Sequence, residues 1–199
     1  MPTVLLVRHG ETDWNRRGQI MGAQPVPLND YGCLQAQQLA TFLRTQPIRR
    51  LYSSPVVRAR QTAEIIGAVL GLPFIVEAGL TEIGVGDWVG RYWKDLADSD
   101  ARMNFYTRPE EARPPGGETL GEVQARAVAA VQRALATADS GPILMVSHAD
   151  VLRTIVAHYL HVSLPTMRQM RIDYASVTAL EITGSDADLL FLNHVPQSA

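Results

Sequence analysis

The sequence is poor in cysteine, and it lacks both a long apolar run and an excess of charge of either sign. Cys33 is the single cysteine, so no internal disulfide can form and no cysteine-based metal site is indicated. No apolar run approaches the roughly 20 residues that span a bilayer. The first residues do not have the pattern of a signal peptide. We therefore expect a cytoplasmic protein that does not contact membranes.

The balance of charge argues against nucleic acid as a partner. The chain holds 18 Lys and Arg against 20 Asp and Glu, a formal net charge of −2, whereas broad nucleic-acid binding needs a basic surface. Hydrophobic residues make up 46% and charged residues 19% of the 199 residues, as in an ordinary globular protein. This length fits one domain over residues 1–199.

Strand-like and helix-like segments alternate along the chain. The apolar segments predict strands over residues 3–7, 50–53, 74–76, 143–147, 176–182 and 189–194. Helices are predicted after an N-cap at Asn29, from Pro55 to Leu70, around residues 93–97, from Leu120 to about Ser140, and over residues 151–160.

This alternation is typical of an α/β fold, a three-layer α/β/α sandwich whose mostly parallel central sheet is closed by an antiparallel edge strand. An apolar edge strand could also support a homodimer. The irregular residues 78–117, rich in Gly and Pro, are expected to form a lid or substrate segment.

Polar clusters stand at three junctions where a predicted strand gives way to a helix. They are Arg8-His9-Gly10, Ser53-Ser54-Pro55 with Arg58, and Ser147-His148. Because the carboxyl ends of parallel strands share one edge of a sheet, two histidines and two arginines should converge there.

A phosphoryl group suits such a convergence, because the planar fork of arginine matches phosphate oxygens in pairs. A neutral imidazole can attack phosphorus and form a covalent intermediate, while a second, protonated histidine would stabilise the developing charge.

Motifs for metals and nucleotides are missing from the sequence. There is no Walker motif and no His-Glu-x-x-His, and the glycines over residues 84–90 have the wrong spacing for a dinucleotide fingerprint. His158 and His161 stand three apart, which favours an ordinary structural role without a nearby cysteine. We therefore expect neither a metal ion nor another cofactor.

Five segments carry motifs that identify a family. They are residues 8–15 (R-H-G-E-T-x-x-N), 53–63 (S-S-P-x-x-R-A-x-Q-T-A), 80–88 (L-x-E-I-x-x-G-x-W), 115–119 (P-G-G-E-S, here ending in Thr) and 146–148 (V-S-H). In this order they resemble the histidine phosphatase superfamily, in its phosphoglycerate mutase-like branch. The resemblance covers essentially the whole chain.

The resemblance implies a role for each matching residue at the phosphoryl site. His9 would be the nucleophile that accepts the phosphoryl group. Arg8, Arg58 and His148 would bind that group, with Asn15 assisting.

Around the leaving group, the resemblance implies a carboxylate and three lining residues. Glu82 would protonate the leaving oxygen and later activate water, a role that suits a carboxyl group with a raised pKa. Thr12, Gln19 and Gly22 would line the substrate side.

Two positions depart from the family pattern. Val89 stands where the phosphatases usually have Glu in W-E-G, and Ala149-Asp150 follow the second histidine where Gly is usual. Neither departure touches the implied catalytic residues, but because of both the family pattern does not define the substrate preference here.

The leading hypothesis is a metal-independent phosphatase that hydrolyses small-metabolite phosphomonoesters through phospho-His9. A cofactor-dependent phosphoglycerate mutase is the alternative enzyme, but mutases of the family carry longer basic insertions after the acid residue, whereas residues 83–117 are compact here. A non-catalytic phospho-ligand binder on the same fold is the third hypothesis. The sequence does not identify the phosphomonoester.

Overall fold

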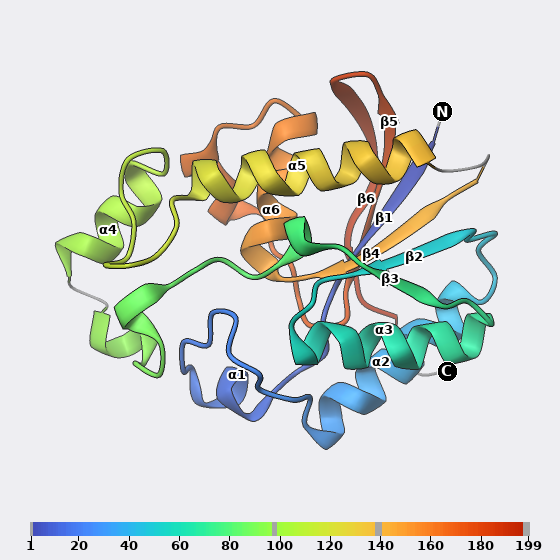
Figure 1. Cartoon of the computed structure of the whole chain (residues 1–199), viewed down its shortest axis with the longest axis horizontal. Helices are drawn as coiled ribbons and strands as arrows, with labels where there is room; N and C mark the ends of the chain where they lie inside the picture. Colours follow the sequence, from blue (N-terminus) through green and yellow to red (C-terminus); the bar gives the residue numbers. More distant parts are fainter. Residues whose placement is uncertain (1, 97–98, 138–140, 197–199) are drawn as a thin grey trace.

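A twisted six-stranded sheet forms the centre of the computed structural model, which describes residues 2–96, 99–137 and 141–196 (Figure 1). The strand order is β3-β2-β4-β1-β5-β6. The strands are β1 (Thr3–Arg8), β2 (Arg50–Ser53), β3 (Phe74–Val76), β4 (Ile143–Ser147), β5 (Val177–Thr183) and β6 (Asp186–His194). Neighbours from β3 to β1 pair in parallel, and β1–β5 and β5–β6 pair antiparallel. This confirms the expected mostly parallel sheet with antiparallel pairing at one edge.

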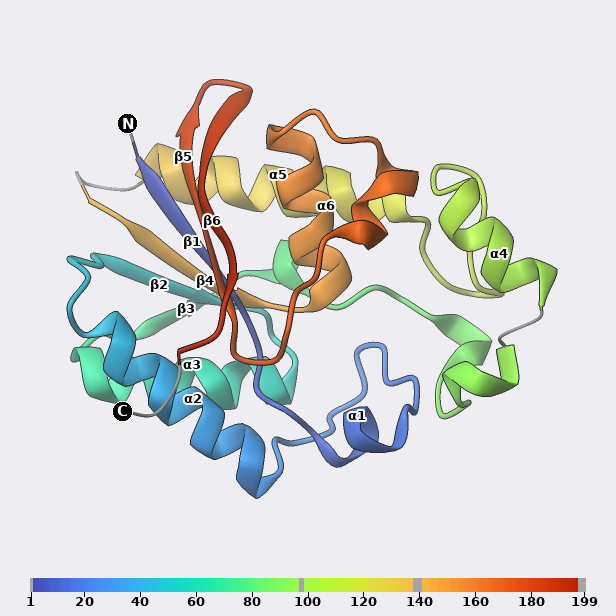
Figure 2. The ribbon, with the colours of Figure 1, turned by 180° about the vertical axis from the view of Figure 1, so that it is seen from behind.

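Helices cover both faces of the sheet, as the α/β/α prediction requires (Figures 1 and 2). The helices α2 (Asp30–Leu43) and α3 (Val57–Leu70) lie on one face, and α5 (Leu120–Thr137) and α6 (Ala149–Tyr159) on the other. The strand β1 shows why its sequence is apolar without alternation. Val4 and Leu6 belong to the core under α5 and α6, whereas Leu5 and Val7 belong to the core under α2 and α3.

The helix ends agree with the sequence at two positions and differ at a third. Asn29 is the N-cap of α2, where its side chain accepts the Gly32 N–H, and Gly71 ends α3 at φ +68°. The prediction that Pro55 opens α3 is wrong, because Val56 is the N-cap and the helix begins at Val57.

Two short helices were not predicted, and both lie toward the carboxyl edge of the parallel strands (Figure 1). The helix α1 (Asp13–Arg17) follows β1, and α4 (Asp100–Thr107) lies inside the segment expected to be irregular. The helix predicted around residues 93–97 is a 3₁₀ turn, Trp93–Leu96, and Ala97 lies outside the described residues. The predicted end of the long helix at Ser140 also lies outside them.

No helix within the described residues is both long enough and apolar enough to cross a membrane.

Candidate active site

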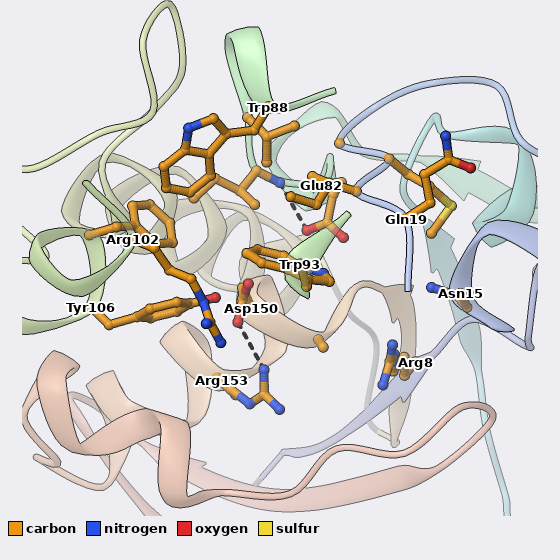
Figure 3. Close-up of a pocket in the computed structure, with 17 residues that line it drawn as sticks. Arg8, Asn15, Gln19, Glu82, Trp88, Trp93, Arg102, Tyr106, Asp150 and Arg153 are labelled. Atoms are coloured by element: carbon orange, nitrogen blue, oxygen red, sulfur yellow. Dashed lines mark hydrogen bonds and ion pairs between the residues drawn. The ribbon is translucent and has the colours of Figure 1, made fainter. Parts of the chain in front are cut away.

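A cavity of about 270 Å³ opens where the parallel strands end (Figure 3). Its walls come from β1, the segment around α1, residues 82–93, α4 and the N-terminal half of α6. This is the edge at which open α/β sheets place their ligands. The lining residues are Arg8, Asn15, Gln19, Ile20, Met21, Gly22, Glu82, Ile83, Val85, Trp88, Trp93, Arg102, Phe105, Tyr106, Ala149, Asp150 and Arg153.

His9 lies directly after β1 and is only 1% exposed. Its Nδ1 is 2.7 Å from the carbonyl oxygen of Gly10. Because a carbonyl oxygen only accepts, Nδ1 carries the proton and Nε2 keeps a lone pair. That Nε2 accepts the Nε–H of Arg58 at 3.1 Å. Burial, together with Arg58 and Arg8, lowers the pKa of His9 well below its usual value, so the ring is neutral.

Arg58 is completely buried in the first turn of α3. Its Nη2 donates to the carbonyl oxygen of Gly22 at 2.8 Å, and its Nη1 to that of Gln24 at 3.3 Å. The same Nη2 lies 3.5 Å from Oε2 of Glu82. These contacts tie Arg58 to the loop after α1 and to the segment that carries Glu82.

Arg8 ends β1 and points into the cavity (Figure 3). Its Nη1 donates to the carbonyl oxygen of Ile172 at 2.6 Å, and its guanidinium lies 3.8 Å from the ring centre of Tyr174. Among the described residues, its buried Nε has no hydrogen-bond partner. A buried donor of this kind is rare in proteins and indicates a place for an acceptor.

His148 is the N-cap residue of α6 and is completely buried. Its Nε2 lies 2.9 Å from Oγ of Ser54, and that oxygen already accepts the Val56 N–H at 3.3 Å. When the Ser54 hydroxyl donates its proton to Nε2, the imidazole proton is on Nδ1. Within the described part of the chain this Nδ1 has no hydrogen-bond partner, and it lies 3.6 Å from Oε2 of Glu82.

The sequence led us to expect a protonated second histidine. Burial, with the nearby charge of Arg58, instead lowers the pKa of His148 well below its usual value. The ring is therefore neutral in the free protein, and when Nε2 accepts from Ser54 it donates through Nδ1–H.

Glu82 projects into the cavity with a side chain that is 17% exposed. Its Oε1 accepts the backbone N–H of Ile83 at 2.9 Å. Burial raises its pKa above the usual value, the positive charge of Arg58 opposes that rise, and the negative charge of Asp150 adds to it. The raised pKa is what a carboxyl group needs in order to donate a proton near neutral pH.

Five of the nine predicted site residues line the cavity, whereas His9, Arg58, His148 and Thr12 are buried and are not among its lining residues. Arg8 and Glu82 are two of the five, and the others are Asn15, Gln19 and Gly22. Thr12 is the N-cap of α1, and its hydroxyl binds the backbone N–H of Asn15 at 3.1 Å. Since the Asn15 side chain in turn accepts the Thr12 N–H at 3.1 Å, Thr12 holds Asn15 in place.

Several cavity residues had been given no chemical role from the sequence. On α6, Asp150 and Arg153 both face the cavity, and Arg153 donates to Asp150 at 2.9 Å (Figure 3). On α4, Arg102 and Tyr106 stand four residues apart, so one face of the helix presents both. The helical spacing after His148 is a signal that could have found Arg153, whereas Arg102 and Tyr106 depend on a helix that was not predicted.

The described residues contain no group of three His, Cys, Asp or Glu side chains that could hold a metal ion.

Comparison with known proteins agrees with this geometry. The family model of the histidine phosphatase superfamily (branch 1) matches residues 4–195. The adenosylcobalamin/alpha-ribazole phosphatase of Salmonella typhimurium is 33% identical over 190 residues, 94% of each chain. A probable phosphoglycerate mutase GpmB from Enterobacter is 32% identical over 91% of this chain and 85% of that protein. The solved mycobacterial glucosyl-3-phosphoglycerate phosphatase is 26% identical, with a TM-score of 0.88 over 96% of this chain and 98% of that one.

The chain belongs to the histidine phosphatase superfamily, branch 1, which confirms the resemblance seen in its motifs. Relatives named as phosphatases also confirm the expected enzyme class, a phosphoric monoester hydrolase.

Proposed function

We propose that this protein hydrolyses phosphomonoesters of small metabolites through a phosphohistidine formed on His9, without a metal ion. One observation carries the proposal. The unprotonated Nε2 of His9 lies near two buried donors that lack partners among the described residues, Nε of Arg8 and Nδ1 of His148. The His148 ring centre is 5.1 Å from that of His9, and the charge of Arg8 acts on the His9 ring. The oxygens of a phosphoryl group are acceptors of the kind that these donors require.

In the first step, the lone pair on Nε2 of His9 attacks phosphorus, and the bond from phosphorus to the leaving oxygen breaks. The Glu82 carboxyl group gives its proton to that oxygen, so the leaving group departs as an alcohol. In the free protein the Nε–H of Arg58 donates to the lone pair on His9 Nε2. When substrate is bound, it donates to a phosphoryl oxygen instead. Asn15, at the cavity wall, assists in binding that group.

In the second step, the Glu82 carboxylate takes a proton from water, and the water oxygen attacks phosphorus. The bond from phosphorus to Nε2 then breaks, which returns neutral His9 and releases inorganic phosphate. Throughout both steps, the guanidiniums of Arg8 and Arg58 stabilise the charge on the phosphoryl oxygens, a task that metal ions perform in other phosphoryl-transfer enzymes.

The cavity size supports a small leaving group. A volume of about 270 Å³ lies just below the range of about 300–1,000 Å³ that is usual for ligand pockets. Trp88, Trp93, Arg102 and Tyr106 line the cavity and belong to residues 78–117, so this segment, with Arg153 of α6, would contact the leaving group. Relatives named for alpha-ribazole and glucosyl-3-phosphoglycerate phosphatases support a phosphorylated metabolite as substrate. The single cysteine supports a cytoplasmic location.

The proposal is tested by trapping the intermediate. After acid-free denaturation of enzyme mixed with a labelled phosphomonoester, we expect a phosphoenzyme that is stable to base and labile to acid. It should be lost in His9→Ala and kept in His161→Ala, which changes an exposed histidine that follows the C-terminal end of α6 and pairs with Asp186. A phosphoenzyme that persists in His9→Ala would show that another residue is the nucleophile.

Two further outcomes identify the other hypotheses. Mutase activity that depends on bisphosphoglycerate, with little release of phosphate, would establish the mutase. Equal inactivity of the wild type and His9→Ala on every ester tried would favour a non-catalytic binder.

A further inference from the structure

The segment that carries Glu82 is held from behind by an ion pair that does not line the cavity. Arg126 comes from α5 and Glu118 from the loop before that helix. The Nε and Nη2 of Arg126 donate to the two oxygens of Glu118 at 2.9 and 3.0 Å, which is a bidentate pair. Both side chains are partly buried, at 24% and 32% exposure.

The pair binds the backbone on both sides of Glu82. Nη1 of Arg126 donates to the carbonyl oxygens of Gly79 and Thr81 at 2.8 and 2.7 Å, and Nη2 lies 3.3 Å from that of Glu82 itself. On the other side, Oε2 of Glu118 accepts the N–H of Gly84 at 2.7 Å. Burial alone would raise the pKa of Glu118, but the Arg126 and Gly84 hydrogen bonds lower it below its usual value, so the carboxylate stays charged.

These contacts fix the position of an otherwise irregular segment. Residues 81–85 belong to neither helix nor strand, so no ladder of backbone hydrogen bonds determines where Glu82 lies. A displacement of about 1 Å at a reacting group can cost about 10²-fold in rate. The carboxyl group of Glu82 must come within hydrogen-bond reach of the leaving oxygen, and the pair holds four backbone groups of the segment from which that side chain projects.

We propose that Arg126 and Glu118 are positioning residues that hold Glu82 in place for proton transfer to the leaving group. This proposal rests on the proposed function, in which Glu82 is the acid. It assigns no contact with substrate to either residue. Its consequence is selective, because only substrates that need a proton on the leaving oxygen depend on where Glu82 lies.

The experiment compares two esters in Arg126→Met and Glu118→Gln. In p-nitrophenyl phosphate the leaving oxygen departs as a stable phenolate and needs little protonation, whereas in an alkyl ester such as glycerol phosphate it needs a proton. The ratio kcat/KM reports the step in which the leaving group departs. We expect it to fall about 10²-fold for the alkyl ester and only severalfold for the aryl ester.

A matched control lies on the same helix. The guanidinium of Arg133 donates to Glu77 at 2.8 Å rather than to residues 79–84, so Arg133→Met should leave kcat/KM unchanged for both esters. Arg126→Lys keeps the charge but not the fork that reaches Glu118 and the carbonyl oxygens together, so it should recover only part of the alkyl ester activity.

A double-mutant cycle separates positioning from a general loss of structure. In the background of Glu82→Gln, the further change Arg126→Met should cost little on the alkyl ester, because the group that it positions is already inactive. If Arg126→Met does not fold, as judged by circular dichroism, Glu118→Gln carries the same test, since it removes the charge and keeps the shape.

The results that would contradict the positioning role differ from those that would contradict the proposed function. Equal losses on both esters, or full additivity with Glu82→Gln, would overturn the positioning role and leave a structural one. No loss on either ester would also overturn it. A wild type that cleaves the aryl but no alkyl ester would remove Glu82 as an acid, and with it this proposal, whereas a wild type inactive on both would overturn the proposed function itself.

Discussion

The Nε–H of Arg58 donates to Nε2 of His9 at 3.1 Å, on the atom that is proposed to attack phosphorus. The other ring nitrogen is held by the carbonyl oxygen of Gly10 at 2.7 Å. The imidazole is thus fixed at both nitrogens and kept in one tautomer by a backbone oxygen and a guanidinium. When a phosphoryl group enters, one of its oxygens must accept the Arg58 Nε–H in place of His9 Nε2. The lone pair on Nε2 is then free to attack.

Removing the Arg58 guanidinium should therefore change both rate and titration. We expect Arg58→Met to lower kcat/KM about 10²- to 10³-fold, the cost of losing one donor to a charged transition state. The pKa of His9 should rise, because the positive charge of Arg58 helps to lower it. Kinetics and a nuclear magnetic resonance titration of the ring measure the two effects. Arg60→Met, an exposed arginine on the same helix, is the control, and an unmoved His9 titration would contradict the coupling.

The raised pKa of Glu82 should set the alkaline limit of activity on alkyl esters. An acid must be protonated to donate, so kcat/KM should fall as pH rises through this pKa. Asp150→Asn should move the fall to lower pH, because the negative charge of Asp150 helps to raise the pKa. Asp13→Asn, at an exposed residue paired with Arg16, should leave the profile in place. The alkaline limit of kcat/KM would belong to another group if it does not shift in Asp150→Asn or if it is still present in Glu82→Gln.

The two buried histidines should make the fold less stable in mild acid. Their pKa values lie well below the usual value in the folded chain, with burial as the main cause, and near 6.5 in the unfolded chain. Below about pH 6.5 the unfolded chain therefore binds more protons than the folded chain. As the pH decreases, the free energy of unfolding falls by up to ~1.4 kcal/mol per pH unit for each histidine.

Urea unfolding of the wild type at several pH values measures this loss. His9→Asn and His148→Asn should each flatten the dependence, whereas the exposed His161→Asn should not. Glu82, whose raised pKa acts in the opposite direction, is common to all of these proteins. Equal slopes in the wild type and both buried-site variants would contradict the prediction.

The glycine after His9 is required by close packing of two backbones. A Cβ on Gly10 would lie 2.4 Å from the carbonyl oxygen of Gly32, in the first turn of α2. We expect Gly10→Ala to lower the free energy of unfolding by about 1–3 kcal/mol, as overpacking does. It should also reduce activity, because the Gly10 carbonyl oxygen orients His9. Gly121→Ala, where the nearest atom is 3.6 Å away, is the control and should be tolerated. Equal stability of the two variants would refute the packing argument.

The strands and the main helices could be predicted because their signals are local. Val4 to Val7 are buried alternately on two faces, which requires an apolar run, and Asn29 caps α2 through its own side chain. The short helices α1 and α4 were missed because they have weak apolar periodicity. The helix α1 has no buried residue, and α4 buries only Phe105. Their caps at Thr12 and Ser99 were the available signals.

By itself, the sequence determined the fold class, the family, and the convergence of His9, Arg58 and His148, because the alternation of strands and helices and the chemistry of the motifs are local features of the chain. Only the tertiary structure decided the protonation of these groups. The neutral state of His148, the raised pKa of Glu82 and the lone pair on His9 Nε2 depend on burial and on charges that distant segments bring together. The same holds for the Arg126–Glu118 pair, since its contacts with residues 79–84 arise only when α5 packs against that segment.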